Sequence, residues 1–291
     1  MGYDWKDKTV IVTGAGTGVG EALCHELASR GAIVYATARS REKCQPVADA
    51  INARGYTAHA EAVDVGNFEQ FKGVMDVVKS RHGSLDVLIN NAAVLFLGEF
   101  YDMDDASIER LVHTNLTAVL VGTLHAYRMM KGQGGGKIVN VSSMGGFLPN
   151  ATMVAYSATK FGVNGLTASL AAEAEGSGVD LQVVCLGFVE SKMLDKAEMK
   201  RGGVDTVHEM LPYKPQPVGI AARNVVDGIE RHRPFIFTPG YAKFFWLLNR
   251  FYPKALHKGA VQTMERYREI IRRTSAKPAR PPAATEQALP N

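Results

Sequence analysis

Residues 9–20 read Thr-Val-Ile-Val-Thr-Gly-Ala-Gly-Thr-Gly-Val-Gly, an apolar run followed at once by a glycine-rich turn. Its first five residues are apolar or β-branched, which is typical of a buried strand. Three glycines of the following turn, Gly14, Gly18 and Gly20, lead into a pattern over Gly18–Arg30 that predicts a helix. Strand, glycine turn and helix together suit a pyrophosphate, because glycines permit close backbone approach and a helix N-terminus offers free N–H groups.

The spacing of these glycines distinguishes two kinds of glycine turn. The pattern G-x-G-x-x-G would need glycine at position 19 or 21, which hold Val and Glu. The chain fits Thr-Gly-x-x-x-Gly-x-Gly instead. A glycine turn alone is also compatible with a simple tight turn, so the dinucleotide interpretation depends on the rest of the chain.

Apolar runs alternate with amphipathic stretches along most of the chain. This alternation predicts an α/β, three-layer, doubly wound Rossmann fold with a central parallel sheet of about seven strands. The expected strands are Thr9–Thr13, Ile33–Ala38, Ala58–Val63, Leu85–Ile89, Lys137–Val141, Asp180–Cys185 and Phe235–Phe237. The expected helices are Gly18–Arg30, Arg41–Arg54, Phe68–Arg81, Asp104–Met130, Met153–Glu175 and Val218–Arg231.

We expect a single catalytic domain over residues 1–273. Residues 187–217 follow a strand without a strand pattern of their own, which predicts a substrate lid, or otherwise a surface insertion. A C-terminal helical segment is expected over 240–273. Its aromatic run at 241–253 suits either contact with substrate, subunit or membrane surface, or a last helix packed on the core. Residues 274–291, rich in Pro and Ala, predict a disordered tail.

Composition narrows the class of protein. The 291 residues are 46% hydrophobic and 21% charged, with a net charge of +4, which suits a globular enzyme and gives no case for nucleic acid. The three cysteines have no metal-site or disulfide spacing, the histidines are dispersed, and no apolar run spans a bilayer. We therefore expect a soluble, cytoplasmic protein without a metal.

The end of the second expected strand indicates which dinucleotide binds. A carboxylate there would bond the ribose 2′-hydroxyl of NAD and repel a 2′-phosphate. This chain reads Tyr-Ala-Thr-Ala-Arg-Ser-Arg over residues 35–41, and Arg39 offers a planar fork that suits a phosphate. The sequence thus predicts NADP(H) rather than NAD, the alternative being that Arg39 is only a solvated charge.

A second group of residues suits proton transfer. Ser143 ends the strand that starts at Lys137, and Tyr156 and Lys160, four residues apart, share one face of the next helix. Hydride transfer to a carbonyl builds negative charge on oxygen, which needs a proton. A free tyrosine titrates near 10, and a Lys cation roughly 5 Å away would lower that pKa by about two units.

On these residues the chain resembles the short-chain dehydrogenase/reductase family, over about residues 8–239. Thr13–Gly20 matches the family's glycine motif, Asp64-Val65 its adenine-contacting pair, and Asn90–Ala93 its Asn-Asn-Ala-Gly segment. The family's catalytic tetrad falls on Asn115, Ser143, Tyr156 and Lys160.

The resemblance implies a role for each member of the tetrad. Tyr156 would be the general acid in reduction and the base in oxidation, and Lys160 would lower its pKa and bind the nicotinamide ribose. Ser143 would bond the substrate oxygen, and Asn115 would anchor a water in the proton relay. Together with the glycine turn and Arg39, the predicted dinucleotide contacts are Gly14, Thr17, Gly18, Val19, Gly20, Arg39, Asp64, Val65, Asn91, Ala92, Tyr156, Lys160, Gly187, Val189 and Ser191.

The chain departs from the family pattern at Ala93, where Gly is usual, and at Leu186 and Ser191, where Pro and Thr are usual. These changes leave the nicotinamide contacts in place but loosen the expected loop.

The expected activity is an NADP(H)-dependent interconversion of a ketone and a secondary alcohol. The aromatic segment and the apolar lid residues favour a bulky hydrophobic substrate such as a steroid, retinoid, fatty-acyl or terpenoid-like carbonyl; those lid residues are Met193, Leu194 and Met199. The alternatives are a 3-oxoacyl-thioester reductase and a non-catalytic dinucleotide sensor. The resemblance implies a homodimer or homotetramer through the helices that carry Asn115 and Tyr156, and the segment 241–253 suits peripheral membrane contact.

Overall fold

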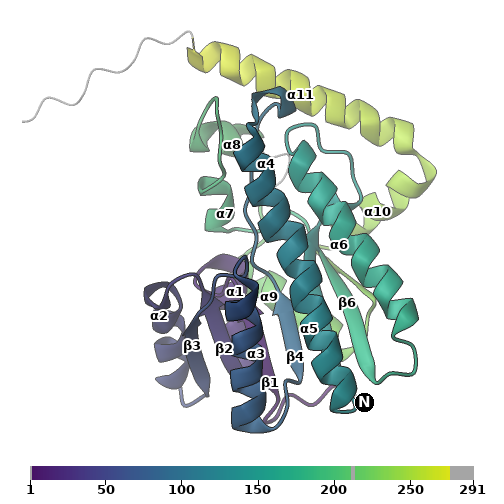
Figure 1. Ribbon diagram of the computed structural model, residues 1–291. Coiled ribbons are helices and arrows are strands. Elements are labelled where there is room, and N and C mark those ends of the chain that lie inside the picture. Colours follow the sequence, from purple (N-terminus) through teal and green to yellow (C-terminus); the bar gives the residue numbers. More distant parts are fainter. Residues whose placement is uncertain (1, 211–213, 276–291) are drawn as a thin grey trace, which may run out of the picture.

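The computed structural model describes residues 2–210 and 214–275. A seven-stranded sheet lies between two layers of helices (Figure 1), with the strand order β3-β2-β1-β4-β5-β6-β7 and parallel pairing throughout. The chain winds outward from β1 in one direction and then from β4 in the other. The predicted doubly wound fold is confirmed, and its switch point lies between β1 and β4, where such sheets bind ligands at the strands' carboxyl ends.

Each expected strand is present, with ends that differ by at most two residues. The strands are β1 (Thr9–Thr13), β2 (Ile33–Ala38), β3 (Ala58–Ala62), β4 (Val87–Asn90), β5 (Gly136–Ser143), β6 (Val179–Leu186) and β7 (Phe235–Thr238). The helices are α1 (Gly18–Ser29), α2 (Arg41–Asn52), α3 (Phe68–His82), α4 (Asp105–Val112), α5 (Ala118–Gly132), α6 (Val154–Glu173), α7 (Lys192–Asp195), α8 (Val204–Met210), α9 (Val218–Glu230), α10 (Tyr241–Phe251) and α11 (Pro253–Ser275).

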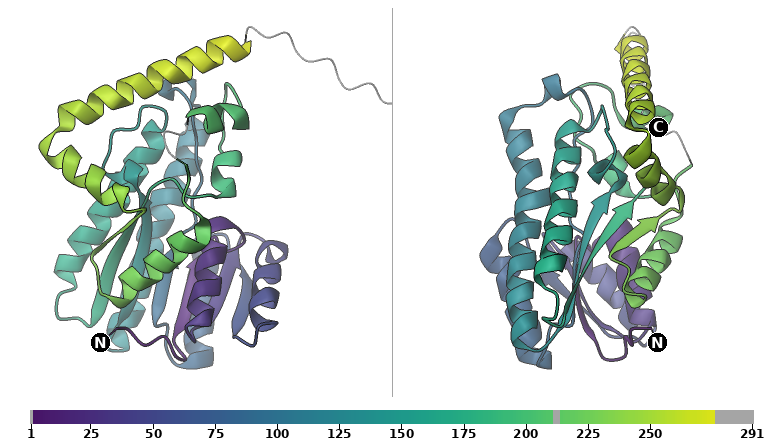
Figure 2. Two further views of the ribbon diagram at one scale, coloured as in Figure 1. Left: turned by 180° about the vertical axis from the view of Figure 1, so that it is seen from behind. Right: turned by 90° about the vertical axis from the view of Figure 1, so that its right-hand side faces the viewer.

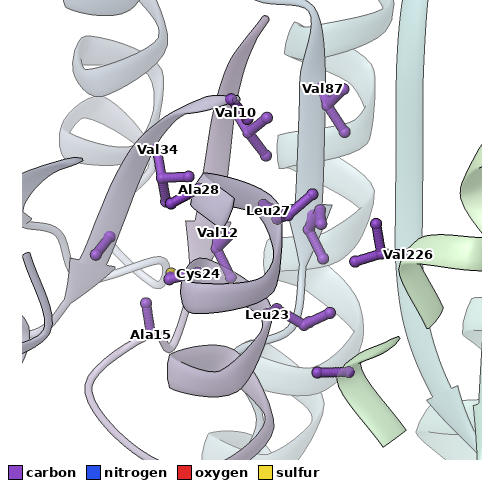
Figure 3. Close-up of a cluster of buried hydrophobic side chains, with 14 of the residues drawn as sticks. Val10, Val12, Ala15, Leu23, Cys24, Leu27, Ala28, Val34, Val87 and Val226 are labelled. Atoms are coloured by element: carbon purple, nitrogen blue, oxygen red, sulfur yellow. The ribbon is translucent and has the colours of Figure 1, made fainter. Parts of the chain in front are cut away.

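Helix α1 anchors the fold to the first strand. Leu23 and Leu27, one turn apart, are fully buried among Val10 and Val12 of β1, and Val226 of α9 closes the cluster (Figure 3). Helices α3, α5 and α6 cover the opposite face of the sheet, as the edge-on view in Figure 2 shows. The glycine turn connects β1 to α1, so the packing of α1 on β1 fixes the position of the turn.

The expected single helix over 104–130 is interrupted. A π-helical turn, His113–Thr117, separates α4 from α5. A π-turn fits an extra residue into the helix and changes which side chain faces inward, and here it buries Asn115 completely. Side-chain periodicity carries no signal for this insertion, which is why the sequence predicted one continuous helix.

The C-terminal helical segment expected over 240–273 consists of two helices, α10 and α11. Pro253 begins α11, a position where its missing N–H costs no helical hydrogen bond. The predicted tail began at Thr274, but α11 continues to Ser275; residues 276–291 lie outside the described residues. Among the helices of residues 2–210 and 214–275, none is long and apolar enough to cross a bilayer.

Candidate active site

A cavity of about 1430 Å³ opens at the carboxyl ends of the strands. Ordinary small-molecule pockets measure about 300–1,000 Å³, so this one has room for two ligands side by side. Every residue that the sequence predicted to contact a dinucleotide lines it, and Ser143 lines it as well. Its remaining walls come from the lid, the loop after β4, and helices α10 and α11.

The glycine turn forms a cradle along the cavity that is packed too closely against neighbouring residues to hold side chains. Gly14 and Gly18 have φ angles of 67° and 62°, a region that favours glycine. A Cβ atom on Gly20 would lie 2.4 Å from the Gly14 carbonyl oxygen, and one on Gly16 would lie 2.8 Å from the Lys43 carbonyl oxygen. Gly16, which the spacing argument passed over, is therefore required by close packing against α2. The cradle leaves the N-terminus of α1 open toward the cavity.

A cluster of hydrogen bonds joins the ends of β1 and β4 at the switch point. The Thr13 hydroxyl oxygen accepts from the backbone N–H of Asn91 at 2.9 Å and of Ala92 at 3.0 Å. In return, the Asn91 side-chain amide donates to the Thr13 carbonyl oxygen at 2.8 Å. The side chain of Asn91 thus holds the glycine turn in place.

Two cations line the cavity at the end of β2. Arg39 is exposed there, as the sequence predicted. Its neighbour in the cavity is Lys43, because Arg41 turns away and donates to Gln45 at 2.9 Å. Lys43 is a residue that the sequence argument missed; its signal is its place in the first turn of α2, next to Gly16.

Tyr156 and Lys160 lie one turn apart on α6, at the centre of the cavity. Lys160 is 2% exposed, and its ammonium donates to the Val141 carbonyl oxygen at 2.8 Å. It stands 5.6 Å from the centroid of the Tyr156 ring. The Ser143 hydroxyl accepts from the Gly145 N–H at 3.1 Å, at the end of β5. Helix α6 and strand β5 therefore bring the three groups together.

Burial dominates the proton affinity of both groups. It raises the pKa of Tyr156 to about 12, against which a hydrogen bond with Ser143 acts. Burial also lowers the pKa of Lys160 to about 8. The sequence argument expected Lys160 to lower the pKa of Tyr156. In this structure the pKa of Tyr156 is raised instead, since desolvation of the phenolate outweighs the hydrogen bond with Ser143.

Asn115 takes a different place from the other three. Its side-chain oxygen accepts from the Val94 N–H and its side-chain nitrogen donates to the Val94 carbonyl, both at 2.8 Å. It is completely buried and lies behind the cavity wall rather than in it. Its contacts fasten the π-turn to the loop after β4.

The lid over residues 187–217 is bound at both its base and its middle. At the base, Gln216 exchanges backbone hydrogen bonds with Phe188 and Glu190, each at 2.9 Å. In the middle, Glu198 does the same with Leu95 and Leu97 of the loop after β4, again at 2.9 Å. The described parts of the lid, residues 187–210 and 214–217, are therefore tied to the rest of the chain at these two points rather than standing free.

The apolar lid residues lie in two different places. Met193 and Leu194 line the cavity, as the sequence led us to expect. Met199 packs instead against Leu97 and Tyr267, beneath α11. Helix α11 also pairs ionically with the lid, through Arg273 and Glu209. No sequence pattern predicted that α11 would pack against the lid.

Comparison with known proteins gives the class. A profile described as "short chain dehydrogenase" matches residues 8–202, more than half of the chain. The chain therefore belongs to the short-chain dehydrogenase family, and the predicted oxidoreductase of this family is confirmed at that level.

Named relatives extend this likeness. The oxidoreductase YxjF of Bacillus subtilis is 28% identical over 229 residues, covering 76% of this chain and 89% of that protein. The 3-oxoacyl-[acyl-carrier-protein] reductase FabG of Staphylococcus aureus is 36% identical over 191 residues, covering 65% and 77%. "Probable oxidoreductase EphD" of Mycobacterium tuberculosis is 28% identical over 87% of this chain, which spans 45% of that protein's length.

Two solved structures share the fold. A short-chain dehydrogenase/reductase of Burkholderia phymatum, in complex with NAD, superposes with a TM-score of 0.79 at 23% identity, covering 85% of this chain and 94% of that one. A short-chain dehydrogenase of Sphingobium yanoikuyae, in complex with NADPH, gives 0.73 at 25% identity, covering 86% and 95%.

The buried ammonium makes a prediction about stability. Below pH 8 the folded protein bears the full cost of burying the Lys160 charge. Between pH 8 and the ordinary pKa of 10.5, the unfolded chain holds a proton that the folded chain releases, so this group makes stability rise with pH. We expect the free energy of unfolding of Lys160→Met, relative to that of the parent, to be highest below pH 8. This difference in the free energy of unfolding should shrink by about 3 kcal/mol toward pH 10.5.

Urea denaturation across this pH range measures the difference. Lys72→Met, on the exposed side of α3, is the matched control and should give a difference that does not vary with pH. A constant difference for Lys160→Met would contradict the burial of a charged lysine.

Proposed function

We propose that this chain is an NADP(H)-dependent oxidoreductase that interconverts a ketone and a secondary alcohol on a bulky hydrophobic substrate. One observation carries the proposal. Tyr156 and Lys160 stand in one cavity between a glycine cradle with two cations and a wall of apolar side chains. A dinucleotide suits the first part and a hydrophobic carbonyl compound suits the second.

The chain's own residues fit the nucleotide. The cradle would accept a pyrophosphate against the N-terminus of α1, because the glycine turn lines the cavity there and a helix N-terminus offers free N–H groups. Arg39 and Lys43 would bind a 2′-phosphate at the end of β2. The NADPH-bound relative from Sphingobium yanoikuyae supports a nicotinamide dinucleotide, while the NAD-bound relative leaves the choice to these two cations.

A bound nicotinamide would supply the hydride for reduction and accept it in oxidation. Tyr156 would donate its phenolic proton to the carbonyl oxygen in reduction and take that proton back in oxidation. Ser143 would donate a hydrogen bond to the same oxygen. Lys160 would stabilise the phenolate left behind. With its pKa raised to about 12, Tyr156 holds its proton at neutral pH, as a proton donor in the reduction must.

The apolar wall supports the substrate class. It combines side chains from the loop after β4, the segment between β5 and α6, the lid, α10 and α11, and a charged or small polar substrate would leave this surface unmatched. The wall residues include Leu95, Phe96, Leu97, Leu148, Met153, Met193, Leu194, Phe245 and Leu256.

A second candidate is a 3-oxoacyl-thioester reductase. The 36% identity to the Staphylococcus aureus FabG favours it, and both reactions use the same proton donor. Rates with an acetoacetyl thioester and with a steroid or aryl ketone, under NADPH, separate the two. A dinucleotide sensor without turnover is disfavoured because Tyr156 and Lys160 are both present in the cavity.

We also propose a homodimer or homotetramer in the cytoplasm. Apolar side chains on α5 and α6 are exposed in the single chain, among them Leu120, Leu124 and Phe161, and association would cover them. The three cysteines are unpaired and buried, which suits a reducing compartment.

Tyr156→Phe removes the proton donor and keeps the ring. We expect kcat to fall by about 10²–10⁴-fold while the Kd for NADPH changes little, because general acid catalysis has this size and the hydroxyl is a minor part of nucleotide binding. Tyr127→Phe, on α5 and outside the cavity, is the control. Full activity of Tyr156→Phe would refute the mechanism, and a parent protein without turnover on ketones and alcohols would favour the sensor.

Arg39→Ala tests the choice of cofactor. The loss of charged hydrogen bonds to a 2′-phosphate should raise the Kd for NADPH about 10- to 100-fold and leave the Kd for NADH nearly unchanged. Arg41→Ala is the matched control, because Arg41 bonds Gln45 outside the cavity. Fluorescence titration of both nucleotides measures the effect. A parent protein that prefers NADH would overturn the NADP(H) assignment.

A further inference from the structure

Helices α10 and α11 meet at Tyr252 and form an elbow that projects from one corner of the molecule (Figure 2). The outer side of the elbow is aromatic. Phe244 is 60% exposed, Phe251 is 69% exposed and Tyr252 is 66% exposed. Because Phe244, Leu247 and Phe251 are spaced three and four residues apart, they form one stripe along α10. We call these four side chains the elbow patch.

The inner side of the same elbow belongs to the cavity. Phe245 of α10 lines it, next in sequence to the exposed Phe244. On α11, Leu256, Ala260 and Thr263 line it with the spacing of one helix face. The elbow is therefore a thin wall between the substrate part of the cavity and the outside.

The charge of the elbow has a single sign. Residues 241–264 contain four Lys or Arg and no Asp or Glu. The four cations, Lys243, Arg250, Lys254 and Lys258, are all exposed. They lie on the two helices that carry the elbow patch, so aromatic side chains and cations share one protruding surface.

We propose that the elbow is a docking surface for an anionic lipid bilayer, in which the aromatic patch enters the interface and the four cations contact the headgroups. Amphipathic helices with aromatic residues and Lys or Arg bind in this way, and membranes attract such cations. A second copy of the chain fits less well, because a two-fold interface would face cations with cations and supply no carboxylate.

Docking would also explain why the cavity wall is placed here. A hydrophobic substrate dissolved in the bilayer would enter beside α11 without crossing water. This consequence rests on the proposed function, whereas the docking itself does not.

Co-sedimentation with vesicles tests the docking. We expect the full chain to bind vesicles of phosphatidylcholine with phosphatidylserine, to bind pure phosphatidylcholine vesicles weakly, and to release at high salt. The double variants Phe244→Ser/Phe251→Ser and Lys254→Gln/Lys258→Gln should each lose about tenfold or more in binding. Tyr56→Ser, an exposed aromatic beyond α2, is the matched control and should bind as the parent does.

Each other outcome overturns the proposal. The proposal is wrong if the parent does not bind vesicles, or if it binds both kinds of vesicle equally. It is also wrong if the elbow variants bind as well as the parent. Light scattering without lipid is the second measurement: a fall in molar mass for Phe244→Ser/Phe251→Ser would assign the elbow patch to a second copy. Turnover of an aryl ketone in the absence of lipid should stay at the parent's rate in these variants, which shows that they fold. If the parent shows no turnover at all, the proposed function fails while the sedimentation result still decides the docking.

Discussion

The hydrogen bond from the buried Lys160 ammonium to the Val141 carbonyl is the interaction on which the site depends. It holds α6 against β5 at the carboxyl edge of the sheet, 2.8 Å from donor to acceptor. Tyr156, one turn earlier, is thereby directed into the cavity beside Ser143. A charge so deeply buried is costly, and its retention is understandable only if a negative charge forms nearby during the reaction.

The two parts of the cavity have different structural origins. The nucleotide part comes from the sheet itself, through the glycine cradle and the hydrogen bonds between Thr13 and Asn91. The substrate part comes from segments added outside the sheet: the lid, which is hydrogen-bonded to the loop after β4, and the helices α10 and α11. The first part is therefore common to dinucleotide-binding folds, and the second is where substrate choice is made.

Local patterns predicted the sheet and most of the site. Strand alternation and the glycine turn are encoded in neighbouring residues, and so are Tyr156 and Lys160 on one helix face. What sequence reasoning missed depends on tertiary contact. Lys43 replaces Arg41 beside Arg39 only because α2 packs on Gly16. The π-turn that buries Asn115 and the raised pKa of Tyr156 both follow from packing rather than from sequence spacing.

A crystal structure of the complex with NADPH would show whether the cavity brings nucleotide and proton donor together. We expect the pyrophosphate in the glycine cradle, the 2′-phosphate between Arg39 and Lys43, and the nicotinamide ring beside the Tyr156 hydroxyl, with room for a carbonyl group between them. A nicotinamide ring placed far from that hydroxyl, or a phenol turned to solvent, would contradict this mechanism, because the proton and the hydride could not then reach the same carbonyl group.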